Sequence, residues 1–352
     1  MQAENILTIG IDYRNVRGGI AAVESVYSSF YKPFNHIATV VDGGKLKKLF
    51  TFFSAVTKFL YWMIFHKEIE IVHVHGASDA SFYRKRIFIN IAKAFGKKVV
   101  YHCHGAEYKR FAEQHHDAVG RMLKKCDCII ALSQSWKEWF EKEFHNENVT
   151  VIKNVISAPV IMDDTVKNAR FTLLFLGRLG QRKGVYDLLD VIACNKARYE
   201  NNLLLLLGGD GETDKVQEII QKEKLNNIVH YEGWVSGDKK VRLLNKADAY
   251  ILPSYNEGLP ISVLEAMSYS LPVVSTNVGG IPEILKNGIN GYMVTPGDKK
   301  GIERAIDRLM CNADLRRDMG KASSIMVKEH LPEYVAQQLS DLYKNISDEK
   351  VH

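Results

Sequence analysis

The chain has 352 residues, of which 46% are hydrophobic and 25% are charged. This length suits two domains with separate cores, and the composition excludes a disordered or fibrous chain. The five cysteines are scattered and odd in number, so we expect no disulfide framework. The N-terminal sequence MQAENILTIG lacks the basic and apolar regions of a signal peptide, which favours a cytoplasmic protein.

The charge is divided unevenly along the chain. Residues 1–125 hold 19 Lys and Arg against 10 Asp and Glu, a net of +9, whereas 126–352 hold 28 against 31, a net of −3. A basic N-terminal third favours an anionic partner. Because the basic residues form no long run and no zinc-finger or RNA-binding motif accompanies them, we expect no nucleic acid. A phosphate-bearing substrate or an anionic membrane surface fits better.

Short apolar runs alternate with segments of helical length. They lie at 5–10, 36–41, 70–75, 97–102, 128–132 and 149–152, and then at 171–177, 202–209, 227–233, 249–254, 271–276 and 291–296. Such strands predict parallel sheets covered on both faces, and hence an α/β fold with two Rossmann-like, doubly wound domains. We expect an N-terminal domain over 1–165, a C-terminal domain over 166–330, and a helix within 331–352 that packs back toward the first domain.

The first loop of interest follows the strand at 5–10. Gly18 and Gly19 precede a helical pattern, and adjacent glycines let backbone N–H groups approach an anion at a helix N-terminus. A Gly-Gly pair before a helix is also a common turn, so both interpretations stay open.

Two strands end in pairs of histidines, His73 with His75 and His102 with His104. Residues two apart in a strand share a face, so four imidazoles approach the edge where ligands bind. A transition metal is one interpretation, but no carboxylate or cysteine completes a familiar ligand set, and we expect no metal. We favour packed, hydrogen-bonded histidines, with His104 nearest a ligand because it lies beside Gly105.

Cations follow the strand at 171–177. Arg178 and Lys183 flank a short loop, where a guanidinium and an ammonium suit a diphosphate. No apolar strand ends in an Asp-x-Asp pair. We therefore expect Arg178 and Lys183, in place of a divalent metal, to stabilise the charge of a leaving nucleoside diphosphate.

Two glutamates eight positions apart mark the next loop and helix. Gly258, Leu259 and Pro260 follow Glu257 and lead into a predicted helix, whose first turn suits a phosphate. Glu265 lies within that helix and can accept hydrogen bonds from two ribose hydroxyls, while Glu257 lies nearer the sugar. The alternative is that both are solvated surface glutamates.

In order, these motifs resemble the family-4 (group 1) retaining glycosyltransferases of the GT-B fold. The motifs are a Gly-Gly loop, His-Gly, Gly-Arg-Leu followed by Lys-Gly, Gly-Gly-Asp-Gly, Pro-Ser…Glu-Gly-Leu-Pro…Glu-Ala, and Gly-Gly-Ile-Pro-Glu. The likeness covers nearly the whole chain and is most specific over 171–296. It implies two domains facing each other across a cleft and no cofactor.

The resemblance also implies a reaction. A nucleotide-diphosphate sugar, with UDP-sugar favoured, would give its sugar to a glycan or lipid-linked acceptor with retention of anomeric configuration, in bacterial polysaccharide or lipopolysaccharide biosynthesis. His104 would lie near the donor sugar and its phosphate, Arg178 and Lys183 on the diphosphate, and Glu257 near the transferred sugar. A front-face route, in which the leaving phosphate helps to deprotonate the acceptor, needs no covalent nucleophile, so we do not assign that role to Glu257.

Further residues are implied to bind the donor. The loop of two glycines would close on the phosphates, the second glutamate would bind the ribose, and a Trp-Val pair would frame the base. These residues are Gly18, Gly19, Gly209, Asp210, Trp234, Val235, Gly258, Leu259, Pro260 and Glu265.

The segment 45–67 bears on the acceptor. It is apolar with a basic leading edge, and Lys58 interrupts it, which argues against a membrane span. It predicts either a core-facing helix between two strands or a helix lying on anionic lipid, near a lipid-linked acceptor and at the inner face of the plasma membrane.

Other classes of function are disfavoured. A catalytically silent GT-B partner subunit or a sugar-binding module would be expected to lack Arg178, Lys183 or Glu257, and all three are present. A dinucleotide oxidoreductase would carry Gly-x-Gly-x-x-Gly after the first strand of one half, and neither half has it.

Overall fold

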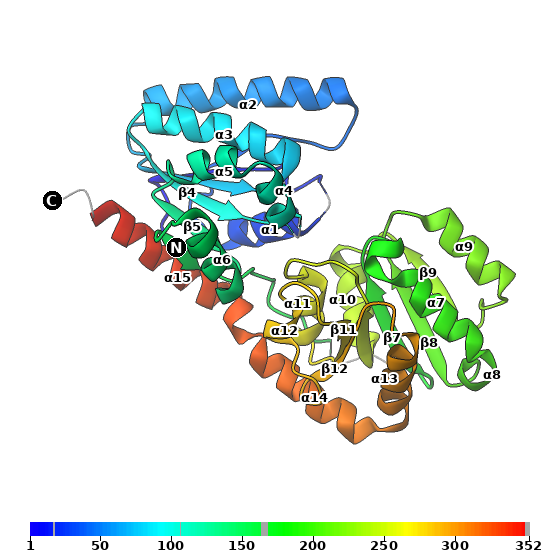
Figure 1. Ribbon diagram of the computed structural model, residues 1–352. Coiled ribbons are helices and arrows are strands. Elements are labelled where there is room, and N and C mark those ends of the chain that lie inside the picture. The colour runs from blue at the N-terminus through cyan, green and yellow to red at the C-terminus, as the bar shows by residue number, and fades with distance from the viewer. Residues whose placement is uncertain (17, 106, 163–167, 349–352) are drawn as a thin grey trace. The chain divides into compact units, whose positions relative to one another are not determined.

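The computed structural model describes residues 1–16, 18–105, 107–162 and 168–348. The chain forms two units, unit 1 (Met1–Ser157 and Glu329–His352) and unit 2 (Ala158–Lys328) (Figure 1). The boundary predicted at 165/166 lies outside the described residues. The C-terminal helix α15 (Pro332–Asp348) belongs to unit 1.

Unit 1 is built on a six-stranded parallel sheet. Its strands have the order β2-β1-β3-β4-β5-β6 and the bounds β1 (Ile6–Gly10), β2 (His36–Ala38), β3 (Ile71–Gly76), β4 (Lys98–Cys103), β5 (Cys128–Ala131) and β6 (Val149–Val151). The helices, besides α15, are α1 (Gly19–Phe30), α2 (Lys45–Phe65), α3 (Asp79–Ala94), α4 (Tyr108–Gln114), α5 (His116–Leu123) and α6 (Gln134–Phe144).

Successive side chains of each strand in unit 1 point to opposite sides of the sheet, and the two sides differ in character. Val72 and Val74 of β3 join the apolar core that α2, α3 and α6 complete. His73 and His75 point to the other face, where Tyr27 of α1 contacts both rings. The apolar face therefore carries the core, and the histidines lie beneath α1.

Unit 2 repeats the architecture with a different strand order, β12-β11-β10-β7-β8-β9. Its strands are β7 (Phe171–Leu176), β8 (Leu203–Gly208), β9 (Val229–Gly233), β10 (Ala249–Leu252), β11 (Val273–Thr276) and β12 (Gly291–Val294). Its helices are the 3-10 turn η1 (Gln181–Lys183), α7 (Val185–Cys194), α8 (Lys196–Tyr199), α9 (Thr213–Lys222), α10 (Gly237–Lys246), α11 (Ile261–Ser268), α12 (Ile281–Ile284), α13 (Lys299–Cys311) and α14 (Ala313–Met326), and the turn η2 (Lys328–His330) leads back to unit 1.

The strand order locates the ligand edge of each sheet. In unit 2, β7 pairs with β8 on one side and β10 on the other, so the order reverses between β7 and β10. In unit 1 the reversal lies between β1 and β3. Ligands of doubly wound sheets bind beyond the carboxyl ends of the strands at these switch points. The two Rossmann-like domains are thus confirmed, and their facing across a cleft stays a prediction.

The segment predicted at 45–67 forms α2, which has two apolar sides. Ala55, Phe59 and Met63, spaced four residues apart, are buried in the core of unit 1. That side confirms the core-facing interpretation. The opposite side is exposed along the whole helix.

Candidate functional site

The loops after β7 and β10 of unit 2 are in tight contact at the switch point. Gly184 has a φ of +71°, and a Cβ there would lie 2.0 Å from the carbonyl oxygen of Pro253. The Tyr255 N–H donates to the Arg182 carbonyl at 2.8 Å, and the Arg182 guanidinium donates to the Asn256 carbonyl at 3.1 Å. Only glycine allows this approach, because any other residue brings a Cβ into the neighbouring backbone.

The contact between the loops brings Lys183 and Glu257 together. The Lys183 ammonium pairs with Oε1 of Glu257, and Ser254 Oγ donates to the same oxygen at 2.6 Å. The Lys183 side chain is 14% exposed and that of Glu257 6%. Burial lowers the pKa of Lys183, and the nearby Glu257 carboxylate opposes that shift. The structure therefore holds the Lys183 side chain at the ligand edge, paired with Glu257, before any ligand arrives.

Arg178 complements Lys183 from the start of the same loop. Its side chain is exposed, and no ion pair joins it to another described residue. Its stem passes over Gly211, where an added Cβ would lie 2.9 Å from Arg178 Cγ. The loop after β7 thus offers one held cation and one exposed guanidinium, a pair suited to a diphosphate.

A pair of glycines, Gly279 and Gly280, packs against the backbone of the segment 257–260. Gly279 has a φ of +57°, and its Cβ position lies 1.9 Å from the Glu257 carbonyl oxygen. The Gly280 N–H donates to the Gly258 carbonyl at 2.6 Å. The chain then passes Leu259 and Pro260 and enters α11, whose N-terminus has no side-chain cap. In the sequence these glycines were only part of the motif that resembles the family, and the structure shows that they support the segment 257–260.

Glu265 lies within α11, as predicted, and is paired rather than free. Its Oε1 lies 2.5 Å from Lys240 Nζ on α10, and its side chain is 15% exposed. Because Glu257 is also buried and paired, the alternative of two solvated surface glutamates is wrong. Ser254 and Lys240, which hold the two carboxylates, were missed from the sequence because nothing local marks them.

The ends of β8 and β9 place the remaining donor-site candidates. Gly209 has a φ of +153°, and a Cβ there would lie 1.8 Å from the Gly177 carbonyl oxygen. Asp210 follows, and its carbonyl accepts from the Leu179 N–H at 2.6 Å. After β9, Trp234 is 40% exposed, whereas Val235 is 9% exposed and packs on the end of β8. Of the pair, Trp234 is the one available to a base.

In unit 1, Gly18 and Gly19 lie at the exposed N-terminus of α1. Gly18 has a φ of +127°, and α1 begins at Gly19 without a side-chain cap. The preceding loop is held by two buried charges that sequence reasoning missed. Glu24 accepts from the Ile11 N–H at 3.0 Å, and Lys85 donates to the Gly10 carbonyl at 2.6 Å.

Burial affects the charge of Lys85. Desolvation lowers the pKa of Lys85 to about 7, and the carboxylate of Glu24 opposes the shift. Glu24 could have been recognised from the sequence, because it is a charged residue among the apolar residues Ala21, Val23 and Val26 of the same helix.

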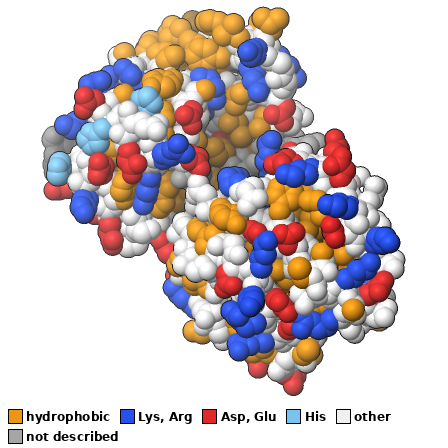
Figure 2. Space-filling model, turned by 45° about the vertical axis from the view of Figure 1, so that its right-hand side comes forward, with side chains coloured by type: hydrophobic (Ala, Val, Ile, Leu, Met, Phe, Trp, Pro, Cys, Tyr) orange, Lys and Arg blue, Asp and Glu red, His pale blue; other side chains and the backbone are white. Residues whose placement is uncertain are grey.

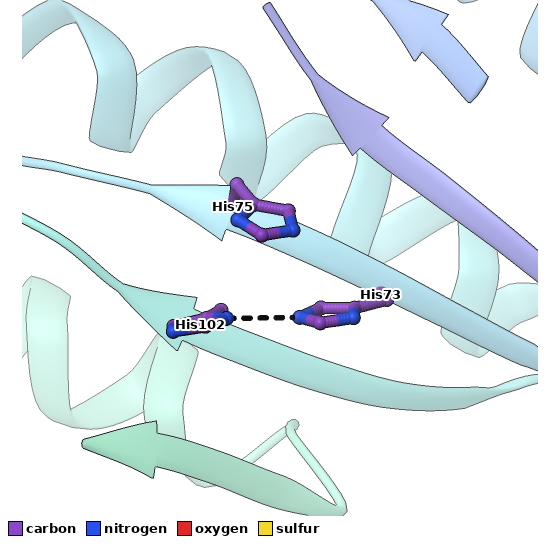
Figure 3. Close-up of side chains that lie close together, drawn as sticks. All are labelled: His73, His75 and His102. Carbon is purple, nitrogen blue, oxygen red and sulfur yellow. Dashed lines mark hydrogen bonds between the residues drawn. The ribbon is translucent and has the colours of Figure 1, made fainter. Parts of the chain in front are cut away.

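The four histidines form a buried, hydrogen-bonded ladder. His73 Nε2 lies 3.3 Å from His102 Nδ1 (Figure 3), and His75 Nδ1 lies 2.9 Å from His104 Nε2. Tyr343 of α15 reaches His73 Nδ1 at 2.5 Å. Burial lowers the pKa of His73 and of His104 to about 3. Packing of His73 and His102 is confirmed, and His104 is itself only 4% exposed.

This ladder does not have the geometry of a metal site. Ring nitrogens of His73, His75 and His102 lie within 4.8 Å of one another. The rings are stacked, with interplanar angles of 20° for His73–His75 and 10° for His73–His102. Metal ligation needs lone pairs that converge on one point, whereas the two His73 nitrogens face His102 and Tyr343. Nε2 of His75 and Nε2 of His102 have no hydrogen-bond partner among the described residues. The expected absence of a metal stays a prediction.

Comparison with known proteins identifies the family. Residues 26–158 match the model of Glycosyltransferase Family 4, and residues 160–326 match that of Glycosyl transferases group 1. An uncharacterized 41.2 kDa protein in the cps region of Klebsiella pneumoniae is 24% identical over 281 residues, 75% of each chain.

Solved structures agree with the fold. Sucrose-phosphate synthase from Thermosynechococcus elongatus gives a TM-score of 0.81 at 17% identity, over 98% of this chain and 99% of that one. Anabaena HepE in complex with UDP-glucose gives 0.74 at 17% identity, over 98% and 100%. The chain therefore belongs to the group 1 glycosyltransferases of the GT-B fold and is a transferase that uses a nucleotide-sugar donor.

Proposed function

We propose that the protein transfers the sugar of a UDP-sugar to a glycan or lipid-linked acceptor with retention of configuration and without a divalent metal. The pathway would be bacterial polysaccharide or lipopolysaccharide biosynthesis in the cytoplasm. One observation carries the proposal: Lys183 is held by Glu257, beside Arg178, at the switch point of unit 2.

The positive charges suit the leaving group of this reaction. When the bond from the sugar to the diphosphate breaks, negative charge grows on the departing phosphate oxygens. Arg178 can bind two of them and Lys183 a third, and Lys183 is already held in place by its ion pair. Charge stabilisation that needs little rearrangement is the most effective kind. These side chains therefore supply what a divalent ion supplies in other transferases.

Glu257 is suited to positioning the sugar rather than to attacking it. Its Oε1 accepts from both Lys183 and Ser254, which stabilises the charged carboxylate and makes it a weaker nucleophile. Its Oε2 is the atom we assign to a hydroxyl of the donor sugar. A front-face route, in which the departing phosphate takes the acceptor proton, fits such a site and retains configuration.

Two comparisons support the finer assignments. The structure of HepE contains UDP-glucose, which favours a uridine nucleotide on a shared fold. The Klebsiella relative is encoded in a cps region, which favours a role in surface glycan synthesis.

Slow hydrolysis of the donor tests the proposal without a known acceptor. The protein is incubated with UDP-glucose and EDTA, and the free sugar is followed by proton NMR before its anomers equilibrate. We expect the α-anomer and UDP to appear together, and Lys183→Met to abolish both. First release of the β-anomer would contradict retention, and loss of activity in EDTA would contradict metal independence.

A further inference from the structure

The outer side of α2 is an unusual surface for a protein in water. Seven of its large apolar side chains are at least half exposed, and Figure 2 shows hydrophobic side chains gathered along this helix at the top of the view, with Lys and Arg around them. The seven are Leu46 (84% exposed), Leu49 (53%), Phe50 (75%), Phe53 (59%), Tyr61 (53%), Ile64 (50%) and Phe65 (66%).

These side chains form one stripe instead of scattered exceptions. Leu46, Phe50, Phe53, Tyr61 and Ile64 recur at intervals of three, four or eight residues, which places them on one face of a helix. Single exposed apolar residues are normal, but a row of them on one face of a 21-residue helix marks an interaction surface. We call this surface the α2 outer face.

The charge of α2 indicates the kind of partner. The helix contains Lys45, Lys47, Lys48 and Lys58, all exposed, and no acidic residue. Lys47 and Lys58 lie on one flank of the apolar stripe, eleven positions apart on the same side of the helix. An apolar face bordered by lysines is typical of helices that lie in the surface of an anionic bilayer.

The packing of α2 favours lying on a membrane over crossing one. By length and composition the helix can cross a bilayer, since an 18-residue window has a mean hydropathy of 1.2. Crossing would remove Ala55, Phe59 and Met63 from the core of unit 1 and place Lys58 in hydrocarbon. A second copy of the chain is also disfavoured, because pairing two outer faces would bring eight lysines together with no acidic partner on the helix.

We propose that the α2 outer face docks unit 1 on an anionic bilayer, with its apolar side chains at the boundary of headgroups and acyl chains. The inference rests on the proposed function in one respect: it selects a lipid-linked acceptor over a free glycan. A cavity of about 390 Å³ opens on the Lys58 flank, where Thr51, Ser54 and Lys58 of α2 meet Asp12, Arg14 and His36. Docking would bring this polar cavity to the level of the headgroups.

Vesicle sedimentation tests the docking. The full chain is mixed with phosphatidylcholine vesicles, with or without phosphatidylglycerol, at low and high salt. We expect binding to the vesicles that contain phosphatidylglycerol, weakened by salt, and little binding to phosphatidylcholine alone. Replacing Lys47 by glutamate should weaken binding by about fivefold or more.

A matched pair of variants tests the apolar stripe. Phe50→Glu with Phe53→Glu should reduce vesicle binding by about tenfold or more for each residue. Ile289→Glu with Ile325→Glu changes two side chains of unit 2 with similar exposure, 59% and 63%, and should leave binding unchanged. Circular dichroism and UDP calorimetry without lipid show whether each variant is folded and whether the donor site is intact.

The outcomes separate docking from catalysis. Equal vesicle binding by the two double variants, or no binding by the natural chain, would overturn the docking while leaving the donor site untouched. A dimer in sedimentation velocity that the phenylalanine variant abolishes, without vesicle binding, would assign the surface to a second copy instead. Vesicle binding without any UDP binding would keep the docking and refute the proposed function.

Discussion

Gly184 allows the close contact between the loops after β7 and β10, and replacing it by alanine tests whether that contact positions the proposed donor site. The residue has a φ of +71° and directly follows Lys183. An alanine Cβ would lie 2.0 Å from the Pro253 carbonyl oxygen, where ordinary contact begins at 3.4 Å. The loop after β7 must then move away from the loop after β10 by about 1 Å or more.

Two effects lower the free energy of unfolding of the Gly184→Ala variant. A left-handed backbone costs a non-glycine residue about 1–2 kcal/mol, and overpacking adds about 1–3 kcal/mol. The matched control is Gly288→Ala, at a φ of +80° with nothing within 4 Å of its Cβ and before β12, at the opposite edge of the sheet. It should lose only the backbone part, about 1–2 kcal/mol.

Urea unfolding and UDP calorimetry measure the difference. We expect Gly184→Ala to lower the free energy of unfolding of unit 2 more than Gly288→Ala does. It should also weaken UDP binding by about tenfold, because its loop carries Lys183 away from Glu257. Equal stabilities and equal UDP affinities for the two variants would refute the tight contact between the loops.

Further predictions concern charge. Arg178→Ala should weaken UDP binding by about tenfold or more with little loss of stability, because the side chain is exposed. Lys183→Met should weaken UDP binding similarly and also lower the free energy of unfolding by about 3 kcal/mol, because the Glu257 carboxylate stays buried without its partner. Calorimetry measures the loss of binding and urea unfolding the loss of stability. Equal stabilities of Lys183→Met and the natural protein would contradict the ion pair. Glu265→Gln should reduce the preference for UDP over 2′-deoxy-UDP, and an unchanged ratio of the two affinities would remove the residue from the ribose site. Because the pKa values of His73 and His104 are lowered to about 3, the unfolded chain takes up protons below about pH 6.5 that the folded chain excludes. The free energy of unfolding should therefore decrease as the pH is lowered, by about 2 kcal/mol per histidine at about pH 5 relative to neutral pH. Urea midpoints that do not change between about pH 7.5 and about pH 5 would contradict this.

The strands were predictable because most are short, apolar and largely buried, and all twelve predicted runs overlap a strand. The pairing of Lys183 with Glu257 was not, because the residues are 74 positions apart and meet only where β10 lies beside β7. Strand order is a property of the whole sheet, and no local pattern reports it.

Other features were missed because their signals are weak. Lys85 looks like any charged residue of a helix, yet it is 1% exposed and donates to the end of β1. The exposure of one side of α2 was harder still to predict, because an apolar helix has the same sequence pattern whether one face or both faces are buried by the rest of the protein. Three-dimensional packing decides which side remains exposed.

We propose that unit 2 binds a nucleoside diphosphate through Arg178 and Lys183 without a metal. Calorimetric titration with UDP, GDP and ADP in the presence of EDTA, with Arg178→Ala in parallel, tests it most directly. We expect binding of UDP in EDTA, weaker binding of GDP and ADP, and loss of UDP affinity in the variant. Failure of the folded protein to bind any of the three, or binding that the variant leaves unchanged, would contradict it.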